Sequence, residues 1–137
     1  MRISQKLEYA CRAAIQLAKQ HDGNTPVRLE DLASREQIPS TFLVQILSDL
    51  KQANLVISKR GKAGGYQLAR PPREITLAEV VNAIDSSLLE EIPLSEGESA
   101  PVLHHIWQAA NLQLTEQLQE KTMKQLSNSS EQPMYYI

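Results

Sequence analysis

Apolar residues recur with a helical period through the first third of the chain. A stripe over residues 3–20 predicts a first helix, and shorter stripes with the same period predict helices over 29–37 and 41–53. Ile38-Pro39-Ser40 separates the second helix from the third, because proline is excluded from a helix interior. Two short helices joined by so tight a turn predict a helix-turn-helix motif.

The ends of these helices carry recognisable signals. Ser40 or Thr41 is expected to cap the N-terminus of the third helix, since a short side-chain oxygen accepts from a free backbone N–H there. Asn54 follows the last turn and is expected in the left-handed conformation that commonly ends a helix. Further on, Thr76 and Glu79 have capping-box spacing and predict a helix that runs to about residue 85.

Between the third and fourth helices the pattern changes to two short β-prone runs, residues 55–58 and 66–69. The segment 59–65 between them is basic and holds three of the five glycines of the chain. These features predict a hairpin with a basic, glycine-rich tip. A helix-turn-helix followed by such a hairpin is a winged helix.

The remainder of the chain predicts an acidic loop and one long helix. Leu103, Ile106, Ala110, Leu114 and Leu118 form a stripe within a helix expected over 102–125. Such a helix is roughly 36 Å long, more than a small domain covers, so we expect it to pack against a second subunit. The expected fold is mainly α with a small β-hairpin. The expected units are 1–85, a winged helix-turn-helix domain; 86–100, a loop; 101–126, a dimerisation helix; and 127–137, a tail.

Composition excludes several classes of protein. The chain has 137 residues, of which 42% are hydrophobic and 22% charged, as in an ordinary globular protein. One cysteine excludes an intramolecular disulfide framework and a zinc site that needs several thiolates. No apolar run is long enough to span a membrane and no signal peptide is present, so we expect a cytoplasmic protein without a membrane partner. P-loop and His-Glu-x-x-His motifs are absent, and we expect no enzyme.

The net charge of −2 conceals a strong asymmetry. Residues 1–73 carry 12 lysines and arginines against 6 acids, a net charge of +6, whereas residues 74–137 carry 2 against 10, a net charge of −8. The first half therefore suits an anionic partner. Double-stranded DNA fits, because Gln45 on the exposed face of the third helix can read adenine and Lys6 and Tyr9 can contact phosphates. The alternative is an ordinary hairpin turn beside a solvated helix face.

Four stretches carry a resemblance to a known family: 1–6 (MRISQK) with Tyr9-Ala10, 38–47 (IPSTFLVQIL), 58–70 (SKRGKAGGYQLAR) and 75–77 (ITL). Together they closely resemble the Rrf-two family of bacterial regulators. The resemblance implies a homodimeric winged-helix repressor in which the long helices form the dimer and each wing enters a minor groove. The candidate DNA-binding residues are Arg2, Lys6, Tyr9, Ser40, Thr41, Gln45, Ser58, Arg60, Gly61, Lys62, Gly64, Gly65 and Tyr66.

One departure from the family concerns its cofactor. Many members hold an iron–sulfur cluster on three cysteines of the loop before the long helix, but residues 86–100 contain no cysteine. We therefore expect no cofactor and no metal ligands, with a redox-responsive or iron–sulfur-responsive regulator as the alternative. Cys11 is either a redox sensor or a half-buried helix residue, and the neighbouring Arg12 is a candidate to lower its pKa.

The last residues are unusual, since a polar stretch ends in Tyr135, Tyr136 and Ile137. This ending resembles that of the cysteine-metabolism repressor of the same family, which has no cluster. The resemblance implies cysteine and sulfur metabolism as the pathway and O-acetylserine sulfhydrylase (cysteine synthase) as a partner, which would bind the three residues in its active site. One alternative is that they pack on their own dimer, and another is that the protein is an interaction module that blocks the enzyme.

Overall fold

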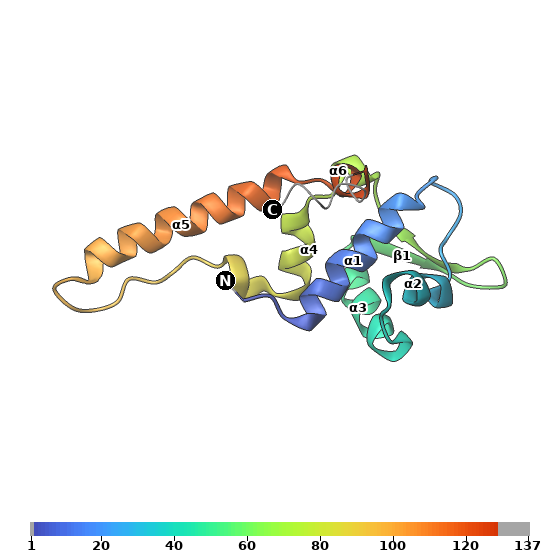
Figure 1. Ribbon diagram of the computed structural model, residues 1–137, viewed down its shortest axis with the longest axis horizontal. Coiled ribbons are helices and arrows are strands. Elements are labelled where there is room, and N and C mark those ends of the chain that lie inside the picture. Colours follow the sequence, from blue (N-terminus) through green and yellow to red (C-terminus); the bar gives the residue numbers. More distant parts are fainter. Residues whose placement is uncertain (1, 129–137) are drawn as a thin grey trace, which may run out of the picture.

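The structure is a computed structural model of the chain, and it describes residues 2–128. Figure 1 shows a body of short helices with a hairpin at one end and a long helix that projects from the other end. The elements in chain order are α1 (Gln5–Lys19), α2 (Leu29–Glu36), α3 (Ser40–Gln52), β1 (Val56–Lys59), β2 (Gly65–Leu68), η1 (Pro72–Glu74), α4 (Leu77–Ile84), η2 (Ser86–Leu89), α5 (Ala100–Glu120) and α6 (Met123–Asn128).

The body is built around α1, which contacts α2, α3, α4 and α6. Ala10, Ala13 and Ala14 are buried on α1, and their small side chains let four helices approach its axis closely. Leu7 and Leu17 extend the same buried face by one turn in each direction. Fully buried side chains from the other elements complete the core: Leu32, Leu43, Ile46, Leu47, Leu50, Val56, Ile75, Val80 and Met123.

The helix-turn-helix motif is α2 and α3, as predicted. Gln37 closes α2 in the left-handed conformation at φ 56°, and Asn54 follows α3 at φ 63°, which confirms the prediction for Asn54. The predicted caps of α3 are wrong. Pro39 is the N-cap, its carbonyl accepts from Leu43 N at 2.9 Å, and no side chain caps the helix. Ser40 is already the first helical residue, so its hydroxyl is available for other contacts.

The hairpin is also present, with β1 antiparallel to β2 in a register that pairs Val56 with Leu68 and Lys59 with Gly65. Val27, which precedes α2, adds one bridge to the outer edge of β2. Its N–H donates to Tyr66 O at 2.7 Å, and Tyr66 N–H donates to Val27 O at 2.8 Å. The base of the wing is therefore joined directly to the start of the helix-turn-helix.

The capping box of α4 is confirmed. Glu79 N–H donates to Thr76 Oγ1 at 3.3 Å and Thr76 N–H donates to Glu79 Oε1 at 3.1 Å. Arg70 donates to the second oxygen of Glu79 at 2.7 Å, which connects the end of the wing to the same helix.

The single helix predicted over 102–125 is wrong, because two helices, α5 and α6, occupy this part of the chain. They are separated at Lys121 and Thr122, where the chain turns into a bridge with Thr76: Leu77 N–H donates to Lys121 O and Met123 N–H donates to Ile75 O, both at 2.8 Å. The break buries Met123 against α1.

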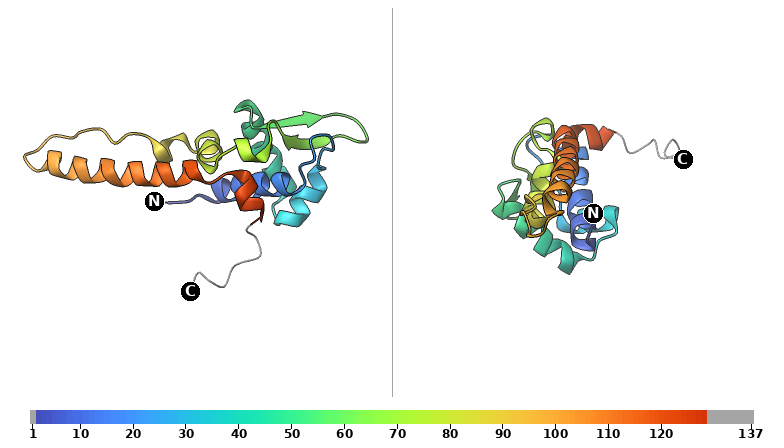
Figure 2. Two further views of the ribbon diagram at one scale, coloured as in Figure 1. Left: turned by 90° about the horizontal axis from the view of Figure 1, so that it is seen from above. Right: turned by 90° about the vertical axis from the view of Figure 1, so that its left-hand side faces the viewer.

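The segment that follows η2 runs outward from the body, and α5 returns beside it, so that the two form a projecting arm (Figures 1 and 2). None of the residues of α5 is buried, although the helix contacts α4 and η2 near its base. Its expected packing partner, a second subunit, stays a prediction. Within the described part of the chain, no helix combines the length and the hydropathy that crossing a bilayer would require.

Candidate nucleic-acid interface

The outer face of α3 presents the polar side chains expected of a recognition helix. Ser40, Thr41, Gln45 and Ser48 are exposed, together with Val44 between them. The buried residues of α3 point into the core, so the polar face lies away from the body. These side chains offer hydroxyl and amide groups that can reach base edges or phosphates.

Tyr9 on α1 sits beside the start of α3 and is ordered by three neighbours. Its ring packs edge-on against Phe42 with centroids 5.5 Å apart, and the Arg12 guanidinium lies 4.9 Å from its centroid. Gln5 Nε2 donates to the Tyr9 hydroxyl at 2.9 Å. Because that hydroxyl is used as an acceptor, its own proton remains to be donated to a phosphate oxygen.

Lys6, one turn earlier on α1, is joined to α3 by a residue that the sequence pattern did not identify. Its Nζ lies 2.7 Å from Asp49 Oδ2, and Gln45 Nε2 donates to Asp49 Oδ1 at 3.2 Å. One carboxylate thus holds two of the candidate DNA-binding side chains. Arg2, also a candidate, is exposed just before α1.

The tip of the wing carries Arg60 and Lys62, both exposed and neither in an ion pair with any described residue. The loop that carries them is anchored from the N-cap of α2, since Arg28 Nη1 donates to Lys62 O at 2.9 Å. Lys59 Nζ reaches Asn24 O at 3.4 Å. Two unpaired cations are therefore presented on an anchored loop, which suits the negative potential of a narrow minor groove.

Ser58 and Tyr66 lie opposite each other in the hairpin register. The Ser58 hydroxyl accepts from Lys51 Nζ at 2.7 Å, so it connects α3 to the wing. Tyr66 is half-buried, and its backbone holds the bridge to Val27. Tyr66 stays a candidate DNA contact, and its backbone in addition makes internal contacts that position the wing.

The three glycines of the wing meet different surroundings. A Cβ on Gly64 would lie 2.3 Å from Lys59 O, and a Cβ on Gly65 would lie 2.3 Å from Val27 O. Both glycines are required by neighbouring backbone within the protein. Gly61 differs, since its φ of +97° favours glycine while the space around it is open.

Cys11 is half-buried on α1 and packs against the core. Burial raises the pKa of its thiol to about 12, and the nearby Glu8 carboxylate contributes to the same increase. The expectation that Arg12 lowers this pKa is wrong, because the Arg12 guanidinium is directed to the Tyr9 ring and to Glu8. The raised pKa favours a structural role for Cys11 over a redox one.

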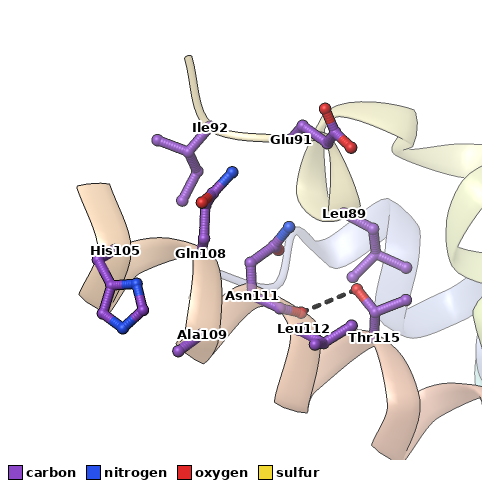
Figure 3. Close-up of a pocket in the computed structure, with 9 residues that line it drawn as sticks. All are labelled: Leu89, Glu91, Ile92, His105, Gln108, Ala109, Asn111, Leu112 and Thr115. Atoms are coloured by element: carbon purple, nitrogen blue, oxygen red, sulfur yellow. Dashed lines mark hydrogen bonds between the residues drawn. The ribbon is translucent and has the colours of Figure 1, made fainter. Parts of the chain in front are cut away.

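The arm contains a hollow between α5 and the segment after η2 (Figure 3). Leu89 and Ile92 face Gln108 and Leu112 across it, and Asn111 Nδ2 donates to Glu90 O at 3.2 Å. Its walls offer carboxylate, imidazole and amide groups but no thiolate. No cluster of three or more His, Cys, Asp or Glu side chains suited to a metal ion occurs within residues 2–128.

The geometry is therefore that of a helix-turn-helix with an anchored basic wing. A family model described as Rrf2, iron-dependent transcriptional regulator, matches residues 3–129. The chain belongs to the Rrf2 family. Members of this family are DNA-binding transcriptional regulators rather than enzymes, and so is this protein.

Individual Rrf2 relatives match over nearly the whole chain. Rv1287 of Mycobacterium tuberculosis, which bears the description HTH-type transcriptional regulator, is 40% identical over 137 residues, covering 95% of this chain and 83% of the relative. The structure of CymR, the global cysteine regulator of B. subtilis, superposes with a TM-score of 0.83 at 30% identity and covers 93% of this chain and 97% of its own. IscR of T. potens follows with a TM-score of 0.79 at 28% identity and coverages of 98% and 91%.

Two features of the Rrf2 protein were missed from sequence. One is the cluster of Asp49, Gln45 and Lys6: Gln45 and Asp49 are spaced i,i+4 on α3, but Lys6 lies on another helix and its contact gave no local signal. The start of α6 did have one: Thr122 and Gln125 have capping-box spacing, and Thr122 N–H donates to Gln125 Oε1 at 3.0 Å. Tyr135, Tyr136 and Ile137 lie outside the described residues.

The raised pKa of Cys11 predicts a thiol that reacts slowly in the folded protein. Near pH 8, a pKa of about 12 leaves about one thiol in ten thousand ionised, whereas an exposed cysteine with a pKa near 8.5 is substantially ionised. Iodoacetamide labelling followed by mass spectrometry should therefore be slower by about a thousandfold or more in native protein than in guanidinium chloride. The pKa of the Cys11 thiol is higher in the folded protein than in the unfolded chain. Its contribution to the free energy of unfolding is therefore fully present below the unfolded pKa and is lost as the pH rises towards 12. Rapid native labelling near pH 8 would restore the redox-sensor hypothesis.

Proposed function

We propose that the protein acts as a homodimeric repressor that places α3 in the major groove and its wing in an adjacent minor groove. The observation that carries this proposal is the pairing of an exposed polar α3 face with two cations, Arg60 and Lys62, that have no acidic partner among the described residues. Cations without internal partners are available to displace the counterions of DNA phosphates.

A homodimer is supported by the arm. Leu103, Ile106 and Trp107 are 47%, 50% and 51% exposed on one side of α5, while Leu112 and His105 point to the opposite side, where the segment after η2 packs. At 100° per residue, the stripe and the hollow thus occupy opposite faces of the same helix. The stripe is an apolar surface of the kind that marks a protein interface, and a second copy of α5 offers the matching surface. A twofold dimer places two recognition helices about 34 Å apart, or at a multiple of that distance, on a pseudo-palindrome.

We further propose that this regulator works without the iron–sulfur cluster held by many relatives. Such clusters need several thiolates, and the segment 86–100 contains no cysteine. The hollow beside it is lined by groups such as His105 and Glu91, while Cys11 lies on α1 in the body. This donor set does not fit a thiolate-ligated cluster.

The proposed pathway is cysteine and sulfur metabolism, with O-acetylserine sulfhydrylase (cysteine synthase) as a partner protein. Two observations support it: the likeness to CymR, whose structure is described as that of the global cysteine regulator of B. subtilis, and the sequence of Tyr135, Tyr136 and Ile137. An apolar and aromatic peptide segment of this kind suits a pocket with an apolar slot and backbone donors.

Replacing Arg60 and Lys62 with alanine is expected to weaken DNA binding by about tenfold or more at physiological salt. The plot of log K against log salt should also become shallower, by about 0.9 for each phosphate that the variant no longer neutralises. Fluorescence anisotropy on a duplex that the wild-type protein selects from a random pool measures both. The matched control removes two exposed cations outside the interface, Arg73→Ala with Lys124→Ala. Equal effects in the two double variants would remove the wing from the proposal, and a wild-type protein that selects no duplex would contradict the proposed function itself.

The dimer is tested on α5 with Trp107→Glu. Burying a carboxylate in an apolar interface without a partner is costly, so we expect a monomer at micromolar concentrations where the wild type is dimeric. Sedimentation velocity measures the mass, and the emission maximum of Trp107, the one tryptophan of the chain, reports its burial in the wild type. Gln119→Glu adds the same charge on the opposite side of α5 and should leave the dimer intact. A wild-type monomer with solvent-exposed tryptophan emission would contradict the proposal.

The partner proposal is tested by deleting Tyr136 and Ile137. Isothermal titration of purified O-acetylserine sulfhydrylase with the full chain should give a stoichiometric complex, and the deletion should abolish it. Ser130→Ala, upstream in the same segment, should bind as the wild type does. Undiminished binding by the deletion variant would sink the idea that these residues dock in the enzyme.

A further inference from the structure

Asp49 is an acidic residue in a surface otherwise suited to DNA. It lies on α3 one turn after Gln45, so the two side chains share a face of the helix. Asp49 Oδ1 accepts from Gln45 Nε2 at 3.2 Å, while Oδ2 lies 2.7 Å from Lys6 Nζ on α1. The side chain of Asp49 is 22% exposed and that of Lys6 is 38% exposed, so the ion pair is partly shielded from solvent at the junction of two helices.

The hydrogen bond to Asp49 settles which way the Gln45 amide points. An ionised carboxylate only accepts hydrogen bonds, so the nitrogen of the amide, rather than its oxygen, must face Asp49. One N–H of Gln45 is then occupied, while the second N–H and the carbonyl oxygen of this exposed side chain have no partner among the described residues. A free N–H beside a free oxygen is the pair that binds adenine, through N7 and N6 in the major groove.

The ion pair acts on affinity in the opposite sense. A carboxylate near the DNA-facing surface repels phosphates, and it offsets the positive charge that Lys6 would otherwise bring to the backbone. Attraction to the DNA backbone does not depend on the base sequence. The loss of this attraction therefore weakens specific and non-specific complexes alike. Asp49 therefore lowers overall attraction while it orders the Gln45 amide, which can read a base.

We propose that Asp49 is a specificity-determining positioning residue, which holds Gln45 in the orientation that reads adenine and restrains Lys6 from sequence-independent phosphate binding. This inference rests on the proposed function, because it assigns a role within the DNA interface. It predicts that one substitution raises affinity for unrelated DNA and lowers discrimination at a single base pair.

Asp49→Ala and Asp49→Asn separate the two effects, since asparagine keeps an oxygen to accept from Gln45 but loses the charge. The probes are a duplex that the wild-type protein selects from a random pool, the same duplex with the Gln45-dependent A·T pair changed to G·C, and an unrelated duplex. The single variant Gln45→Ala identifies that base pair. It is the position at which the wild type prefers A·T over G·C by about tenfold to a hundredfold and the variant does not. Glu98→Gln, which removes one exposed carboxylate from the arm, controls for net charge.

Both Asp49 variants should bind the unrelated duplex several-fold more tightly than the wild type and Glu98→Gln do, with a steeper salt dependence because Lys6 is released. Only Asp49→Ala should lose most of the discrimination at the A·T pair. Adding Gln45→Ala to it should cost little more, since the two residues act as one unit. Thermal melts establish that each variant is folded, and Asp49→Asn carries the affinity test should the alanine variant be unstable.

The proposal is overturned by full discrimination in Asp49→Ala, by additive losses in the double variant, or by no base pair that depends on Gln45. These results differ from a failure of the proposed function, in which the wild-type protein selects no duplex at all.

Discussion

The alanine face of α1 determines how the rest of the body is arranged. Ala10, Ala13 and Ala14 present almost no side-chain bulk, so α2, α3, α4 and α6 pack against one short helix. A larger side chain at any of these positions would have to displace a neighbouring helix, because protein interiors are close-packed. The same helix carries Lys6 and Tyr9 at its first turns, both in contact with α3. The packing that forms the core therefore also sets the position of the candidate phosphate contacts relative to the recognition helix.

The wing depends on backbone contacts more than on its own sheet. A two-stranded hairpin is marginally stable by itself, and here Val27 adds a third stretch of backbone to its edge. Gly65 makes that addition possible, since a side chain at this position would collide with Val27 O. Arg28 then anchors the loop through Lys62 O. Gly65, a candidate DNA contact, thus also serves to hold the wing in place, and together with Arg28 it leaves the side chains of Arg60 and Lys62 free at the tip.

Local signals were sufficient to predict most of the body from sequence. The helices up to residue 85, the left-handed Asn54 and the capping box at Thr76 follow from patterns within a few residues of each other. The break between α5 and α6 could not be predicted from periodicity alone, because its cause is a bridge between Thr122 and the distant Thr76. The ion pair between Lys6 and Asp49 is similar in kind, since it needs α1 and α3 to be packed first.

The separation of charge along the chain becomes a separation in space. Residues 86–120, which form η2, the following segment and α5, carry six acidic side chains and no lysine or arginine. The arm lies at the opposite end of the molecule from the hairpin (Figure 1), and α5 alone is about 31 Å long at 1.5 Å per residue. Salt screens exposed charges beyond about 8 Å at physiological ionic strength, so most of the acids of the arm do not weaken the field at the wing. DNA near the wing is therefore exposed to the positive charge of residues 1–73 rather than to the net charge of the chain. A net charge of −2 is consistent with DNA binding for this reason. The acids of the arm also disfavour DNA at that end, which leaves the α3 and wing face as the electrostatically accessible one.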